Sequence, residues 1–330
     1  MKRTSLRRYA APAATVAVLA LTLAACGGDE EGSGGDSATG LSGTIAADGS
    51  STVGPLTAVA SELFNEANPD VRITVGESGT GGGFEKFCAG ETDLSNASRP
   101  IDTEESTEGP ACEKNGIEYQ EMVVANDALT VIVPTSNDFA TCLTTEQLKM
   151  IWEPKADGEV TNWNQVDPSF PDQELDLYGP GTDSGTFDYF TDEINGEEGA
   201  SRADYTPSED DNIIVEGVAG SEGGLGYLGF TYYEENADKL NAVEIDSGDG
   251  CVAPSPETVQ DGTYTPLGRP LFIYPSIASL TDNEAFAAFI EYYVASDAEI
   301  AEAAQFIPLS EDQKTTLESE LADAKSAAGL

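Results

Sequence analysis

Short turns rich in serine, threonine and glycine recur along this chain, and most of them stand between a strand pattern and a helix pattern. They occupy residues 48–52, 77–83, 96–99 and 181–186. Such turns present backbone N–H groups and hydroxyls at the positive end of a helix dipole, where an oxyanion is held. Their recurrence indicates several anion-binding turns built into one fold.

The alternation of strands and helices predicts an α/β fold with mostly parallel sheets. Strand patterns cover 43–47, 71–75, 119–125, 129–134, 175–178, 225–230 and 270–274. Helix patterns cover 55–67, 82–88, 144–152, 185–194, 283–295, 297–304 and 310–327. Ligands of such folds bind outside the carboxyl ends of the strands, so two facing α/β lobes would place the turns across one cleft.

Extended crossings near 124–134 and 266–275 are the predicted hinges between the two lobes. We therefore expect lobe I to comprise residues 41–128 and 266–330, and lobe II to comprise residues 129–265.

The first two turns carry more hydroxyls and glycines than helix capping needs. An N-cap uses one hydroxyl, whereas residues 50–52 supply three in a row, so we expect Ser51 to donate its hydroxyl and Thr52 its backbone N–H. Four glycines in residues 79–83 cost backbone entropy, which a close approach of backbone to ligand explains better than a flexible loop does. Ser78, Gly79 and Thr80 are the predicted contacts there. The turn lacks the Lys-Ser/Thr ending of a nucleotide P-loop.

The other two turns each bring a charged residue. Arg99 follows Ser98 and precedes a proline, which suits bidentate contact with an oxyanion, although a structural salt bridge is the alternative. Asp183, Ser184, Gly185 and Thr186 open a helix, and a capping turn there has the geometry of an anion site. Asp183 would accept a proton that phosphate carries and sulfate lacks.

Charge and composition exclude several functions. The chain has 60 acidic and 15 basic residues, no histidine and a net charge of −45, which we attribute to solubility or to adaptation to salt. Such charge argues against nucleic acids and anionic membrane surfaces as partners. Without histidine, Ser-His-Asp and Cys-His catalysis and imidazole metal sites are excluded. We expect a protein that is not an enzyme and that uses no cofactor or metal.

The N-terminus has the pattern of an export signal. Basic residues precede an apolar stretch at 13–23, which is short for a membrane span. Residues 23–27 read Leu-Ala-Ala-Cys-Gly, a bacterial lipobox that predicts cleavage after residue 25 and a lipid on Cys26. The alternative is a secreted protein with an incidental cysteine. Residues 26–40 are polar and glycine-rich and predict a flexible acidic tether.

Four further cysteines in an exported chain predict two disulfides, for which three pairings exist. We favour Cys88–Cys112, which closes a short loop, and Cys142–Cys251, which ties the two ends of a central segment. The spacings do not match a metal knuckle.

In their order behind a lipobox, the strings at 48–52, 78–84, 93–100 and 183–186 resemble those of the phosphate-binding lipoproteins that serve ABC importers. The resemblance spans about residues 43–310 and implies a two-lobed, type II periplasmic-binding-protein-like fold. It implies that phosphate receives hydrogen bonds from Ser51, Thr52, Ser78, Ser184, Gly185 and Thr186.

This chain departs from the family pattern at two positions. Arg99 stands where many members carry an aspartate, and Pro180 stands where the same members carry an arginine. The two departures look compensatory, since the arginine has moved to the other lobe. They leave Asp183 as the candidate proton acceptor.

The resemblance implies a monomeric, lipid-anchored receptor on the extracellular face of the cell membrane or in the periplasm. Such a receptor holds inorganic phosphate between its lobes and releases it to an ABC permease. A binder of sulfate or molybdate, an exported phosphoester hydrolase and a surface adhesion or signalling protein are the alternatives.

Overall fold

The computed structural model describes residues 40–103, 108–182 and 184–330. Within these ranges the strands are β1 (Gly43–Gly49), β2 (Val71–Val75), β3 (Leu94–Ala97), β4 (Met122–Pro134), β5 (Cys142–Thr144), β6 (Asp176–Pro180), β7 (Thr206–Ser208), β8 (Gly224–Gly229), β9 (Leu240–Ala242), β10 (Glu244–Asp246), β11 (Cys251–Val252) and β12 (Gly268–Pro275).

The helices are α1 (Gly54–Ala67), α2 (Gly79–Cys88), α3 (Glu108–Asn115), α4 (Thr145–Trp152), α5 (Trp163–Val166), α6 (Gly185–Phe190), α7 (Asp211–Gly220), α8 (Phe230–Glu235), α9 (Pro256–Gln260), α10 (Ile277–Asp282), α11 (Glu284–Ala295), α12 (Asp297–Ala303) and α13 (Glu311–Ala328). A 3₁₀ turn, Pro154–Ala156, follows α4, and a π turn, Thr191–Asn195, follows α6. In the described part of the chain, we find no helix with the length and apolar character that a membrane crossing requires.

The strands form one mixed sheet in the order β2-β1-β3-β12-β4-β8-β6-β7, with β9 also paired to β4, and a separate small sheet of β11, β10 and β5. Parallel pairs join β1 to β2 and β3, and β6 to β7 and β8. The pairs made by β4 and β12 are antiparallel. This α/β architecture confirms the predicted fold class.

Strand β4 is continuous where the sequence predicts two separate strands. Asn126 and Asp127 interrupt the apolar pattern but remain in the strand, because β12 pairs with them through Pro270 and Arg269. The first part of β4 pairs with β12, and the last part pairs with β8 and β9. One strand therefore connects two groups of elements.

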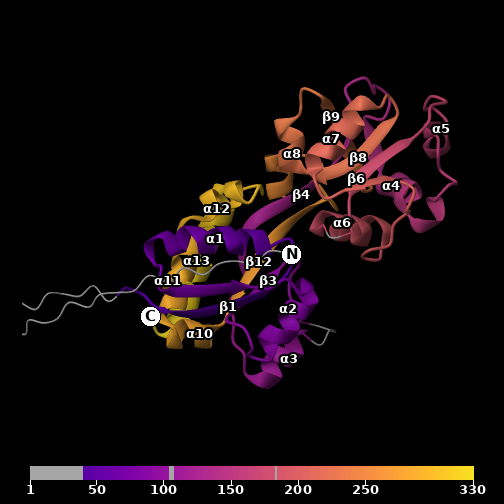
Figure 1. Cartoon of the computed structure of the whole chain (residues 1–330). Helices are drawn as coiled ribbons and strands as arrows, with labels where there is room; N and C mark the ends of the chain where they lie inside the picture. Colours follow the sequence, from indigo (N-terminus) through magenta and orange to yellow (C-terminus); the bar gives the residue numbers. More distant parts are fainter. Residues whose placement is uncertain (1–39, 104–107, 183) are drawn as a thin grey trace, which may run out of the picture. The chain divides into compact units, whose positions relative to one another are not determined.

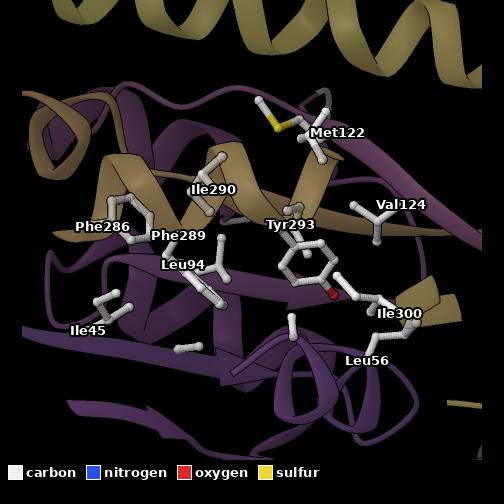
Figure 2. Close-up of a cluster of buried hydrophobic side chains, with 14 of the residues drawn as sticks. Ile45, Leu56, Leu94, Met122, Val124, Phe286, Phe289, Ile290, Tyr293 and Ile300 are labelled. Atoms are coloured by element: carbon white, nitrogen blue, oxygen red, sulfur yellow. The ribbon is translucent and has the colours of Figure 1, made fainter. Parts of the chain in front are cut away.

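Two large cores underlie these two groups. The first core joins β1, β3 and the start of β4 to α1 and the C-terminal helices, and Figure 2 shows Phe286, Phe289, Ile290 and Tyr293 gathered there with Leu94. The second core lies within residues 128–267, apart from Ile307. In Figure 1 the indigo β1 and β3 accordingly lie with the yellow α11 and α13, while α4, α7, β6 and β8 form the other group.

Capping explains where several helices begin. Thr144 and Gln147 form a capping box at α4, and Ser310 and Gln313 form another at α13. Helix α7 was not predicted, since two glycines lower its helix propensity. Its apolar face is nevertheless buried, and a Cβ on Gly217 would lie 2.4 Å from the Tyr178 ring, so close packing overrides the propensity.

Two disulfides, Cys88–Cys112 and Cys142–Cys251, join the pairs that the sequence favours. The first ties α2 to α3. The second ties β5 to β11 at the ends of the small sheet.

Helix α2 packs its backbone directly against the end of β1. A Cβ on Gly83 would lie 2.4 Å from the Cα of Gly49. Gly49 itself has φ +142° and would place a Cβ 2.1 Å from the Asn96 carbonyl oxygen. This backbone contact fixes the turn after β1 relative to the turn before α2.

We expect Gly83→Ala to lower the free energy of unfolding by about 2 kcal/mol, because the backbone of β1 must move to admit the methyl group. Gly81→Ala on the same helix is the control, since its Cβ would meet no described atom closer than 3.9 Å. Denaturant unfolding of both variants tests this. Equal stability of the two would contradict the packing argument.

Candidate anion-binding site

A cavity of about 440 Å³ opens where three of the four serine- and glycine-rich turns meet the start of α6. The cavity is lined by hydroxyls and backbone of the turns together with acidic residues of α6 and of the segment after it. The lining residues are Ser50, Ser51, Thr52, Ser78, Gly79, Thr80, Gly81, Gly82, Ser98, Arg99, Gly185, Asp188, Tyr189, Asp192, Glu193, Glu198 and Arg269.

The turn between β1 and α1 lies directly against the N-terminus of α6. A Cβ on Gly185 would lie 2.8 Å from the Thr52 Oγ1 and 3.3 Å from the Ser51 Oγ. These residues are far apart in the sequence, so the fold brings two predicted anion-binding turns together. Their hydroxyls and backbone N–H groups can converge on one small oxyanion.

Ser78 is held by an acidic residue of β1. Its backbone N–H and its hydroxyl both donate to Asp48 Oδ1, at 3.1 and 2.5 Å. Lys86 Nζ donates to the other Asp48 oxygen at 2.6 Å. Burial raises the pKa of Asp48, but the hydrogen bonds from Lys86 and Ser78 outweigh it and hold that pKa below its ordinary value. Both Ser78 donors are thus engaged by Asp48 in this structure, so a bound oxyanion would compete with Asp48 for them.

Thr80 and Ser98 join the second and third turns. Their hydroxyl oxygens lie 3.0 Å apart, and the Ser98 backbone N–H donates to Thr80 Oγ1 at 3.2 Å. Both residues line the cavity. The β2–α2 and β3 turns therefore form one continuous polar surface.

Arg99 lines the cavity but forms the salt bridge that was the alternative to ligand contact. Its Nη2 and Nη1 donate to the two carboxylate oxygens of Glu108, at 2.7 and 3.0 Å. The Arg99 side chain is 48% exposed. Its charge is therefore already matched by a carboxylate at the rim.

The remaining predicted residues lie differently. Ser184 caps α6, since its Oγ accepts from the Thr186 backbone N–H at 3.2 Å. Among the described residues, neither Ser184 nor Thr186 lines the main cavity; Thr186 instead lines a smaller one of about 120 Å³ beside Asp127. Asp183 lies outside the described residues.

Arg269 is one of the lining residues that sequence reasoning missed, and it is a cation. It comes from β12, opposite Asp127 of β4, and its Nε donates to Asp127 Oδ2 at 3.2 Å. Its Nη2 donates to Thr52 Oγ1 at 3.3 Å, and its guanidinium carbon lies 3.4 Å from the Tyr189 ring centroid. Two features of the sequence could have pointed to Arg269: it is one of only 15 basic residues, and it falls in a predicted hinge.

Four carboxylates, which we call the acidic wall, line the same cavity: Asp188, Asp192, Glu193 and Glu198. Burial raises the pKa of Asp188, the charge of Glu198 adds to this, and Arg269 opposes it. Burial and the charge of Asp192 likewise raise the pKa of Glu193 against the opposing charge of Arg269. The acidic wall weakens the binding of anions that carry no proton, and its carboxylates can accept a hydrogen bond from an anion that carries one.

Metal-ligand geometry occurs elsewhere in the described residues, at Cys142, Glu244 and Cys251. The two cysteines form a disulfide, so their sulfur atoms offer no thiolate.

Comparison with known proteins decides the family. A model described as a PBP superfamily domain matches residues 34–297. Protein SphX of Synechocystis is 48% identical over 269 residues, which cover 82% of this chain and 79% of SphX. The phosphate-binding protein PstS of Staphylococcus saprophyticus is 41% identical over 304 residues, covering 92% and 91%. The chain belongs to the PstS and SphX family of the PBP superfamily. This membership confirms the resemblance carried by its serine- and glycine-rich turns.

A solved structure agrees with this assignment. The crystal structure of "a possible phosphate binding protein" from Planctomyces limnophilus is 44% identical, with a TM-score of 0.80. The match covers 86% of this chain and 99% of the other. The fold of this PBP-superfamily chain is thus shared over nearly the whole of that protein.

Proposed function

We propose that this chain binds inorganic phosphate outside the cell membrane and delivers it to an ABC importer. The observation that carries the proposal is the meeting of the Ser51–Thr52 turn with Gly185 at the start of α6, inside a polar cavity. Relatives named as phosphate-binding proteins support the choice of ligand.

The phosphate is held mainly by neutral donors. Ser51, Thr52, Gly79, Thr80, Ser98 and Gly185 line the cavity and supply hydroxyls and backbone N–H groups. Ser78 would donate its hydroxyl to phosphate by turning it away from Asp48 Oδ1. Ser184 and Thr186 do not line the cavity in this structure and would reach phosphate only after α6 moves closer to it, and Asp183 is the candidate proton acceptor. The hydrogen bonds from such preorganised donors to phosphate become stronger when the cleft closes and excludes water.

Residues 41–128 with 266–330 form lobe I and residues 129–265 form lobe II, and β4 and β12 are the hinges between them. Their antiparallel pairing at the junction of the two cores supports this division. The protein works as a monomeric receptor without catalysis. A lipid on Cys26 anchors it, and residues 26–40 give it reach to the permease.

Calorimetric titration of ligand-stripped mature protein with phosphate, sulfate and molybdate tests the function. We expect phosphate to bind one-to-one and sulfate to bind at least about 100-fold more weakly, because ionised carboxylates reject an anion without a proton. Tighter binding of sulfate or molybdate would replace phosphate as the ligand. Release of phosphate from p-nitrophenyl phosphate by pure protein would contradict the receptor assignment.

A further inference from the structure

The cavity contains two arginines in different environments. Arg99 lies at the rim, and both of its terminal nitrogens donate to one carboxylate. Arg269 is more enclosed, with its side chain 17% exposed against 48% for Arg99. A cation shielded from water interacts more strongly with a bound anion, since solvent screens it less.

Three elements hold the Arg269 guanidinium. Asp127, from the neighbouring strand, accepts a hydrogen bond from Nε, at the inner edge of the group. The guanidinium carbon lies over the Tyr189 ring of α6, and the Tyr189 hydroxyl donates to the Pro266 carbonyl oxygen at 2.6 Å, which fixes the ring. The outer nitrogen Nη2 reaches Thr52 Oγ1 in the cavity.

In this orientation the outer end of the Arg269 guanidinium is directed toward the region where the β1–α1 turn meets the start of α6. Thr52 is both the acceptor of the Arg269 hydrogen bond and one of the hydroxyls nearest Gly185. An oxyanion at that position would be within reach of the guanidinium fork, which suits bidentate contact with such an ion.

We propose that Arg269, and not Arg99, is the principal cationic contact of the bound anion, and that Asp127 and Tyr189 position it; this inference rests on the proposed phosphate-binding function. Arg269 stands on a strand at the junction of the two cores and contacts both the β1–α1 turn and α6. Anion binding at this residue therefore favours the arrangement in which these two turns are close.

Removing Arg269 alone would leave the buried Asp127 carboxylate without its partner, so the test uses a neutral pair. Phosphate affinity is measured by calorimetry for wild type, Asp127→Asn, the double variant Asp127→Asn/Arg269→Gln, and Arg99→Gln. We expect Asp127→Asn to bind at least as tightly as wild type, because its amide oxygen still accepts the positioning hydrogen bond from Arg269 Nε while a competing negative charge is removed. The double variant should bind at least about 100-fold more weakly than Asp127→Asn, because it loses charge-assisted bidentate hydrogen bonds. Arg99→Gln should change affinity less than about fivefold, as expected for an exposed charge.

Two further variants address positioning. Tyr189→Phe keeps the ring and should retain affinity, whereas Tyr189→Leu removes the surface under the guanidinium and should weaken phosphate binding about tenfold at unchanged stoichiometry. Equal affinities of Asp127→Asn and the double variant, or a larger loss in Arg99→Gln, would overturn the inference while wild type still binds phosphate. Failure of the wild type to bind phosphate would instead overturn the proposed function.

Discussion

Gly185→Val should reduce phosphate affinity by at least about 100-fold while the chain remains folded, because displacement of a binding group by about 1 Å has effects of this size. The first added carbon would already lie 2.8 Å from Thr52 Oγ1 and 3.3 Å from Ser51 Oγ. The branched side chain would hold the two turns apart and occupy the space where their donors converge. The third neighbour is the Thr52 backbone nitrogen at 3.4 Å, and neither Ser51 nor Thr52 belongs to the two apolar cores, so we expect the chain to fold.

Calorimetry with phosphate and thermal unfolding without it measure the two parts of this prediction. Gly81→Ala is the matched control, because Gly81 also lines the cavity but a Cβ there would meet no described atom closer than 3.9 Å. If Gly185→Val binds phosphate as tightly as Gly81→Ala does, the two turns do not hold the ligand together.

Phosphate affinity should fall about tenfold between pH 6 and pH 8. Repulsion between the negative charges of phosphate and those of the acidic wall grows as the pH rises, and it weakens binding. Asp188 and Glu193 have pKa values raised by burial and by Glu198 and Asp192 respectively, with Arg269 opposing both shifts. As the pH rises through this range, phosphate passes from its monoanion to its dianion, which brings one more negative charge against the acidic wall. The repulsion therefore increases, so the sign is weaker binding at higher pH.

The matched variant for this prediction is Asp188→Asn, tested by titrations with phosphate and with sulfate at both pH values. Sulfate carries no proton in this range, so the ionised Asp188 repels it without compensation. The variant should bind sulfate about tenfold more tightly than wild type does, and its phosphate affinity should depend less on pH. An unchanged ratio of phosphate to sulfate affinity would exclude Asp188 from selectivity.

Local sequence explains why the hydroxyl turns can be predicted. Ser51, Thr52, Ser78 and Gly185 stand at helix starts, where capping chemistry and anion binding need the same short polar residues. Their type and position depend on neighbours in the chain, so alternating strand and helix patterns were enough to place them.

The cationic and acidic parts of the site depend on distant pairings that no local pattern encodes. Arg269 meets Asp127 only because β12 pairs with β4, 142 residues away in sequence. The same pairing retains Asn126 and Asp127 in one continuous strand, where hydropathy alone predicted a break. Arg99 found its partner in Glu108, and nothing in the sequence distinguished that residue from the many other acids. The four residues of the acidic wall could likewise not be distinguished in a chain with a net charge of −45.

A crystal structure of the mature chain grown with phosphate would test the central claim most directly. We predict one tetrahedral ion within hydrogen-bonding distance of the Ser51–Thr52 turn, the Ser78–Thr80 turn and the backbone N–H groups at the start of α6. Phosphate bound outside this cavity, or bound to one of these turns with the others turned away in the closed protein, would contradict the account.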